Sequence, residues 1–157
     1  MKHTIQALVE NKFGVLARVS SLFSARGYNI TSLTVGETQD SAVSCMTIVV
    51  EAEEERILEQ IKKQLNKLID VITVIDFTNR DYIDRELLLV KLGKEKNSKE
   101  VVDKLIKEYD ISVIEDAADY YTLEICDQRQ YVEEILKELR QFNIRELVRT
   151  GKIAISR

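Results

Sequence analysis

The architecture of this chain can be inferred from one segment, Val9-Glu-Asn-Lys-Phe-Gly-Val-Leu-Ala-Arg-Val19, and from Arg26-Gly-Tyr-Asn-Ile30 shortly after it. The first segment predicts an apolar strand that passes through an Asn-x-x-Gly turn directly into an amphipathic helix. A helix N-terminus presents backbone N–H groups without intrahelical partners and the positive end of the helix dipole. Because Gly14 has no side chain, a carboxylate or phosphate could approach the backbone there. The alternative is a tight turn that Gly14 permits and Asn11 hydrogen-bonds, without a ligand.

Hydrophobic periodicity extends this pattern through the N-terminal half of the chain. Residues 3–10 alternate as a strand does, and residues 14–26 place their apolar side chains on one helical stripe that ends at Gly27. The predicted elements are a strand at 3–10, a helix at 14–26, strands at 28–37 and 43–51, a helix at 53–68 and a strand at 71–78.

The second half of the chain repeats the same order of elements. Asn97 and Glu100 are spaced as a capping box, which marks the start of the first helix of this half. The predicted elements are a strand at 87–92, a helix at 98–109, strands at 111–117 and 120–126, a helix at 128–141, and strands at 144–149 and 152–156.

This doubled β-α-β-β-α-β order predicts an α+β protein with two consecutive ferredoxin-like plaits, each an antiparallel sheet with both helices on one face. A break near Asn79-Arg-Asp81 separates the predicted domains, 1–79 and 80–157. Each half is shorter than about 80 residues, so its core is small and its uncovered sheet face or edge favours pairing. We therefore expect a homodimer.

The composition is that of a soluble globular protein. Of 157 residues, 45% are hydrophobic and 32% are charged, and no apolar run approaches the length of a membrane span. The N-terminus enters a strand pattern at once, without a signal or transit peptide, so we expect a cytoplasmic protein. The net charge of −4, and the single aromatic residue Phe77 on the central strands, argue against nucleic-acid binding.

No set of residues has the pattern of a catalytic or metal site. The single histidine, His3, stands at the start of the first strand and is expected on the surface. Cys45 and Cys126 stand far apart in strand patterns, which predicts buried free thiols rather than a zinc site or a disulfide. The five glycines form no Walker or dinucleotide motif. We therefore predict that the chain is not an enzyme and holds no metal.

Asn29 narrows the class of ligand that the first turn would bind. In a plait, the start of the second strand can approach the first turn of a symmetry mate when two sheets pair. A carboxamide there could accept a hydrogen bond from an ammonium and donate one to a carboxylate, the two poles of an amino acid. Phe13, Val15 and Leu16 would add apolar contact, which suits an aliphatic side chain.

These residues resemble those of a known family. Asn11-Lys-Phe-Gly-Val-Leu-Ala-Arg18, joined to Leu22-Phe-Ser-Ala-Arg-Gly-Tyr-Asn-Ile-Thr-Ser-Leu-Thr-Val35, is similar to the ACT domain of the small, regulatory subunit of acetolactate synthase (acetohydroxyacid synthase). The likeness continues through Gln64-Leu-Asn-Lys-Leu-Ile-Asp-Val71, Asp84-Arg-Glu-Leu-Leu-Leu-Val90 and Leu147-Val-Arg-Thr-Gly-Lys152. It therefore covers nearly the whole chain, in order.

The resemblance implies a regulatory subunit without a cofactor of its own. In this family the catalytic large subunit holds thiamine diphosphate, magnesium and FAD, and makes acetolactate or acetohydroxybutyrate from pyruvate. The small subunit raises that activity and confers feedback inhibition by valine, and sometimes by leucine or isoleucine, in branched-chain amino-acid biosynthesis. The implied partners are therefore the large subunit, a second copy of this chain and a branched-chain amino acid.

The resemblance also implies an effector site between two ACT domains. Carried onto this sequence, the site takes Asn11, Phe13, Gly14, Val15 and Leu16 from one chain, and Asn29 and Ile30 from its partner. Phe13 departs from the family, which often has proline or a small residue before the glycine, and a bulky ring there could change the response to valine.

Two other functions stay open on the sequence. One is a free-standing ACT-type amino-acid sensor that serves another partner. The other is a small plait hydrolase that resembles acylphosphatases and uses the first turn as an anion cradle. The second is disfavoured because no arginine precedes the helix, and Arg18 lies a full turn inside it.

Overall fold

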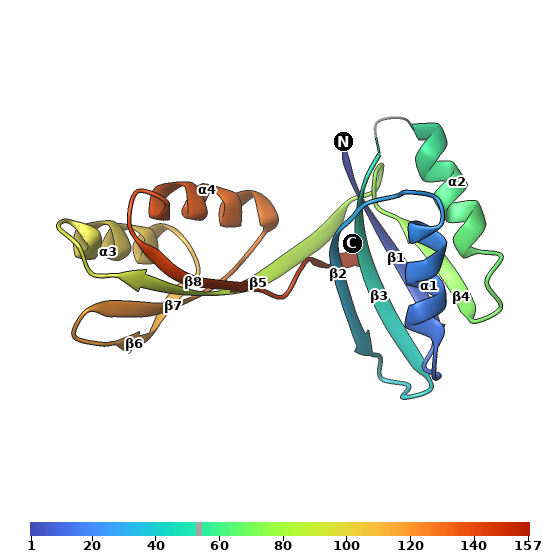
Figure 1. Ribbon diagram of the computed structural model, residues 1–157, viewed down its shortest axis with the longest axis horizontal. Helices are drawn as coiled ribbons and strands as arrows, with labels where there is room; N and C mark the ends of the chain where they lie inside the picture. The colour runs from blue at the N-terminus through green and yellow to red at the C-terminus, as the bar shows by residue number, and fades with distance from the viewer. Residues whose placement is uncertain (53–54) are drawn as a thin grey trace. The chain divides into compact units, whose positions relative to one another are not determined.

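The computed structural model describes residues 1–52 and 55–157. The chain divides into two compact units. The N-terminal unit comprises Met1–Tyr82 together with Ala154–Arg157, and the C-terminal unit comprises Ile83–Ile153. Both units are α+β, and each is an antiparallel sheet with two helices on one face, as the doubled order of elements predicts (Figure 1).

The N-terminal unit has a four-stranded sheet with the strand order β2-β3-β1-β4, in which neighbouring strands are antiparallel. Residues 53–54, where the predicted second helix begins, lie outside the described residues. The elements are β1 (Lys2–Glu10), α1 (Val15–Ser24), β2 (Ile30–Glu37), β3 (Val43–Glu51), α2 (Glu55–Leu65) and β4 (Val71–Asp76).

The core of the N-terminal unit lies between the sheet and its helices. Alternation in β1 turns Ile5, Ala7 and Val9 towards the helices, where all three are buried. These side chains pack in one core with the apolar stripes of α1 and α2. Phe23 of α1 and Ile61 of α2 are fully buried there. Burial of one such side chain contributes about 1.5 to 3 kcal/mol, so this alternation holds α1, and with it the first turn, against the sheet.

The C-terminal unit repeats the topology, with the strand order β6-β7-β5-β8, whereas β9, which pairs with β5, belongs to the N-terminal unit from Ala154 onwards. The first strand of this half begins five residues earlier than predicted, because charged residues interrupt its apolar pattern between Tyr82 and Glu86. The elements are β5 (Tyr82–Gly93), α3 (Ser98–Glu108), β6 (Ile111–Asp116), β7 (Tyr120–Asp127), α4 (Arg129–Leu139), β8 (Ile144–Arg149) and β9 (Ile153–Ser156).

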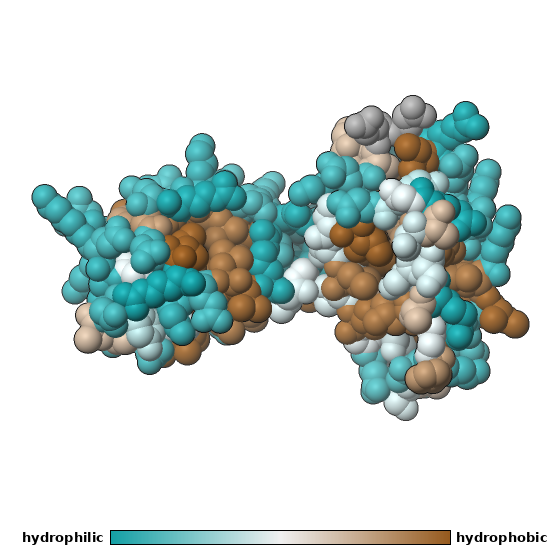
Figure 2. Space-filling model, in the orientation of Figure 1, coloured by the Kyte–Doolittle hydropathy of each residue, from teal (hydrophilic) through white to brown (hydrophobic). Residues whose placement is uncertain are grey.

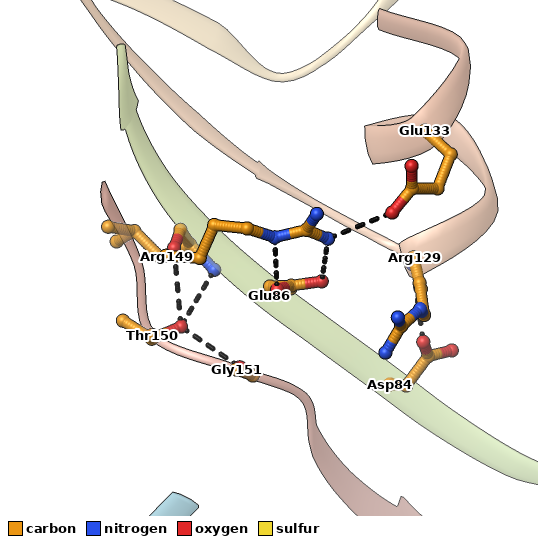
Figure 3. Close-up of polar contacts among 8 residues, drawn as sticks. Asp84, Glu86, Arg129, Glu133, Arg149, Thr150 and Gly151 are labelled. Carbon is orange, nitrogen blue, oxygen red and sulfur yellow. Dashed lines mark hydrogen bonds and ion pairs between the residues drawn. The ribbon is translucent and has the colours of Figure 1, made fainter. Parts of the chain in front are cut away.

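An ion-pair network that includes the buried Glu86 ties α4 to the sheet of this unit (Figure 3). Arg149 on β8 donates from Nε and Nη2 to the two carboxylate oxygens of Glu86, each at 2.8 Å, and from Nη2 to Glu133 on α4 at 3.0 Å. Glu86 is buried, and its hydrogen bond raises the pKa of Arg149 further above its ordinary value. Asp84 accepts the Arg129 N–H at 3.2 Å, where the helix dipole favours a carboxylate.

The capping box predicted at the start of α3 does not form. Asn97 has a φ of 66° and makes no side-chain hydrogen bond to the helix. A capping side chain normally needs an extended backbone at this position. Instead, the Glu95 N–H donates to Ser98 Oγ at 3.1 Å, and Ser98 is buried.

The last residues of the chain complete the N-terminal unit. Gln6 Nε2 on β1 donates to the Ala154 carbonyl at 2.8 Å, and the Arg157 N–H donates to the Asp81 carbonyl at 3.2 Å. Ala154 is buried. The sequence predicted a boundary near residue 80, but it did not predict that the chain returns to the N-terminal unit at Ala154.

Among the described residues, no helix is both long enough and apolar enough to cross a membrane.

Candidate effector site

The first turn is held in place by the side chain of Asn11. This residue follows the end of β1, and its N–H donates to the Ala42 carbonyl at 2.7 Å. Its Nδ2 donates to Glu37 Oε1 at 3.1 Å and to the Ser41 carbonyl at 2.8 Å. Both amide hydrogens are therefore used, and in the described part of the chain Oδ1 is left without a donor. Asn11 can offer a ligand an acceptor.

Gly14 shapes the N-terminus of α1. It is the N-cap residue, and its φ of 81° is left-handed, which disfavours any side chain at this position. Its carbonyl accepts the Arg18 N–H at 3.0 Å. Within the described ranges, the N–H groups of Gly14, Leu16 and Ala17 have no hydrogen-bond acceptor, as expected for the first turn of a helix. The turn therefore offers donors for a carboxylate.

Arg18 lies over the same turn, although the sequence placed it too deep in the helix to serve an anion. Its Nη1 lies 3.0 Å from the point where a Cβ on Gly14 would stand. A helical side chain leans back towards the residue four positions before it, which explains the contact and is the signal that sequence reasoning missed. Arg18 Nε donates to Asp70 Oδ2 at 2.7 Å, and the buried Asp70 accepts the Glu10 N–H on its carbonyl.

The turn thus has two electrostatic poles. On the helix side, the free N–H groups and the Arg18 guanidinium favour a negative charge. On the sheet side, Asn11 Oδ1 and the exposed carboxylate of Glu37 favour a positive charge. Glu37 was not predicted, because it reaches the turn from the end of β2 through the β2–β3 register. Opposite poles at one turn match a zwitterion, such as a free amino acid.

The predicted apolar residues of the turn differ in exposure. Phe13 is fully exposed, and the Leu16 side chain is 45% exposed. Val15 is buried in the core of the N-terminal unit, so it can serve a ligand only through its backbone. Phe13 and Leu16 are therefore the apolar side chains that a ligand at this turn could reach.

Asn29 and Ile30 lie at the opposite end of the sheet. Ile30 begins β2 and pairs with Val50 near the end of β3, whereas Asn11 lies beside the start of β3. The 8 residues of β2 span about 26 Å at roughly 3.3 Å per residue. Asn29 is exposed, and its carbonyl accepts the Glu51 N–H at 3.3 Å. One chain therefore does not bring the two parts of the predicted site together.

His3, Cys45 and Cys126 lie on three different strands, β1, β3 and β7. His3 is buried rather than exposed, because alternation in β1 and its bond from Nδ1 to Thr78 Oγ1, at 3.0 Å, hold it against the sheet. Cys45 and Cys126 are free and half-buried, and burial raises the pKa of the Cys45 thiol. No group of three or more His, Cys, Asp or Glu residues suited to a metal ion occurs among the described residues.

Two family models cover most of the chain. Residues 5–73 match the AHAS small subunit-like ACT domain, and residues 85–157 match the small subunit of acetolactate synthase. A probable acetolactate synthase small subunit of Archaeoglobus fulgidus is 42% identical over 157 residues, covering 100% of this chain and 98% of the relative. The acetolactate synthase small subunit of Bacillus subtilis is 38% identical, covering 100% of this chain and 91% of the relative.

The fold agrees with these matches. The crystal structure of the acetolactate synthase small subunit from Thermotoga maritima superposes with a TM-score of 0.88 at 32% identity, over 100% of this chain and 98% of that one. The likeness extends through both units, including the ACT domain that carries the two-pole turn. The chain therefore belongs to the acetolactate synthase small-subunit family, and it is a regulatory rather than a catalytic subunit.

Proposed function

We propose that this chain raises the activity of the acetolactate synthase catalytic subunit and imposes feedback inhibition by a branched-chain amino acid, with valine as the first candidate. The amino acid would bind between the N-terminal ACT domains, residues 1–79, of two copies. The observation that carries this proposal is the pair of opposite poles at the first turn, which suits a zwitterion. Thiamine diphosphate, magnesium and FAD would bind to the catalytic subunit. The C-terminal domain, residues 80–157, would be the second domain of the small subunit.

Pairing through β2 would complete the site. β2 is an outer strand of its sheet. Its apolar residues are incompletely covered: Ile30 and Leu33 are partly buried and Val35 is 41% exposed. Figure 2 shows hydrophobic residues gathered on the N-terminal unit over β2 and β3. An outer strand with uncovered apolar residues favours pairing with another strand. Antiparallel pairing of two β2 strands about a two-fold axis would bring Asn29 of the second copy towards Asn11.

The ligand contacts follow from the two poles. The carboxylate of valine would accept hydrogen bonds from the N–H groups at the start of α1 and face the Arg18 guanidinium. Its ammonium would donate to Asn11 Oδ1 and lie near Glu37, and its side chain would contact Phe13 and Leu16. A ligand held by two copies favours one dimer geometry, and such differential binding is what couples sites, typically by about 1 to 3 kcal/mol.

The experiment reconstitutes the catalytic subunit with this chain and titrates valine against wild type, Gly14→Ala, Gly14→Asp and Asn29→Ala. Gly14→Asp would place a carboxylate beside Arg18 and the free N–H groups, so we expect valine inhibition to be lost. Gly14→Ala is the control for backbone strain, because it shares the left-handed φ and the close contact without the charge. We expect Gly14→Ala to keep more of the valine inhibition than Gly14→Asp does. Asn29→Ala should weaken the inhibition.

If Gly14→Asp stays as sensitive to valine as wild type, the proposed site is wrong. Valine binding in calorimetry without any effect on the catalytic subunit would instead favour an ACT-type sensor for another partner. That alternative retains the two-pole turn but not its link to synthase activity.

A further inference from the structure

A groove of about 450 Å³ runs between α1 and α2 on the helical face of the N-terminal unit. Its apolar lining comes from Ala17, Leu22 and Leu68, and its charges come from Arg18, Arg26 and Lys67. None of the described residues that line it is acidic. The groove is therefore cationic in a chain whose net charge is −4.

Among the described residues, two of the three cations have no carboxylate partner. Arg26 donates to the Leu22 carbonyl at 3.3 Å and to Gln64 Oε1 at 2.8 Å, and both acceptors are neutral. Lys67 is exposed and makes no ion pair within the described part of the chain. Arg18 alone has an acidic partner, Asp70. The groove keeps positive charge available to a second molecule.

Two exposed hydrophobic residues are sequence neighbours of groove residues. Ile69, which directly follows Leu68, is 94% exposed, and the exposed Leu16 directly precedes Ala17. A groove with an apolar lining between two helices is typical of a surface that binds an amphipathic segment of another protein. An acidic segment would also be attracted by the groove cations and held in register by them.

We propose that this groove is the docking surface for the catalytic subunit, and that it takes an acidic segment of that subunit with an apolar side chain over Leu22 and Leu68. This rests on the partnership with the catalytic subunit in the proposed function, but not on the amino-acid site. Charge complementarity selects the occupant, because an acidic segment neutralises Arg26 and Lys67, whereas a basic one is repelled.

Arg18 belongs both to this groove and to the first turn. Its Nη1 stands 3.0 Å from the Cβ position of Gly14, and its side chain lines the groove. A carboxylate bound at the turn would attract the same guanidinium that faces the docked segment. The two sites therefore share a charged group, which gives effector binding a direct means of changing the affinity for the catalytic subunit.

The test compares two double charge reversals in the full chain. Arg26→Glu with Lys67→Glu reverses the groove, and Lys104→Glu with Lys137→Glu reverses two lysines at the α3–α4 cavity of the C-terminal unit. Affinity for the isolated catalytic subunit is measured by biolayer interferometry, and activation by titration of synthase activity. We expect the groove variant to lose affinity about tenfold or more and the control to stay near wild type. Wild-type affinity should also fall as salt is raised.

Lys67→Glu alone guards against misfolding of the double variant, because Lys67 makes no ion pair among the described residues. It should weaken docking while the thermal midpoint stays at the wild-type value. Equal affinity of the groove variant and wild type, or an equal loss in the control, overturns the proposal. Valine binding to each variant without the catalytic subunit is measured by calorimetry, so failure of the groove and failure of the amino-acid site give different results.

Discussion

Arg18 adds a charged side chain to a turn whose other donors to an anion are backbone N–H groups. Asp70 pairs with Nε and holds the guanidinium near Gly14, so a carboxylate at the start of α1 would meet Nη1 of a cation that Asp70 already partly neutralises. A hydrogen bond to a charged group contributes about 1.5 to 3 kcal/mol. We therefore expect Arg18→Gln to weaken valine binding in calorimetry about tenfold or more, and Arg18→Lys to restore part of it.

Valinamide is the matched ligand for this prediction, because it keeps the ammonium and the side chain but has no carboxylate. We expect Arg18→Gln to leave its affinity unchanged. An equal loss for valine and valinamide would mean that Arg18 maintains the turn rather than recognising the carboxylate.

Asp76 gives the N-terminal unit a pH dependence. Burial acts to raise the pKa of this carboxyl, but the hydrogen bonds from Thr78 and the ion pair with Lys62 outweigh it, so its pKa lies below the ordinary 3.8. A lowered pKa stabilises the folded state above the ordinary value, and that stabilisation is lost as the pH falls through the folded pKa. Urea midpoints between pH 7 and pH 3 should therefore fall less steeply below about pH 4 for Asp76→Asn than for wild type. Parallel curves would contradict this.

At the scale of the elements, the sequence predicts the order of both halves because each apolar alternation or stripe has one buried face. Ile5 and Val9 in β1, and Phe23 in α1, are buried as their spacing predicts. The errors come from local geometry that spacing cannot express. Asn97 fits a capping box by sequence, but the backbone enters α3 with a left-handed φ, which removes the cap.

The candidate effector site likewise has residues that the sequence identifies and residues that only the structure reveals. Asn11 and Gly14 are recognisable from the sequence, because one segment contains them both. Glu37 and Asp70 reach the same turn from other elements, and only the sheet register and a contact over 52 positions reveal them. The poles of the turn are therefore a tertiary property.

The ion pair between Glu86 on β5 and Arg149 on β8 gives a prediction at the element scale. Glu86→Gln would leave the Arg149 guanidinium without its bidentate partner beside β5. Loss of one partner of a buried pair costs several kcal/mol, and because Arg149 is partly exposed we expect about 2 to 3 kcal/mol in urea denaturation. The matched control is Glu146→Gln, whose pair with Lys91 is exposed and should contribute less than about 1 kcal/mol. Similar losses in both variants would refute the role of burial.

For the whole molecule, the return of the chain into the N-terminal unit can be tested by removing Ala154–Arg157. The deletion removes the carbonyl that accepts from Gln6 and the N–H that donates to Asp81. Each lost hydrogen bond costs about 1 kcal/mol, so hydrogen exchange should quicken in β1. Peptides from α3 and α4 are the internal control and should exchange at wild-type rates. If hydrogen exchange quickened equally in both units, the last four residues would not act on the N-terminal unit alone.

That same return sets the order in which the protein can mature during translation. The ribosome makes residues 154–157 only after the whole C-terminal unit, so the Gln6 contact cannot form while that unit is still being synthesised. The first unit to emerge is thus among the last to be finished. The N-terminal unit therefore gains its contacts with residues 154–157 only after the intervening C-terminal unit has been made.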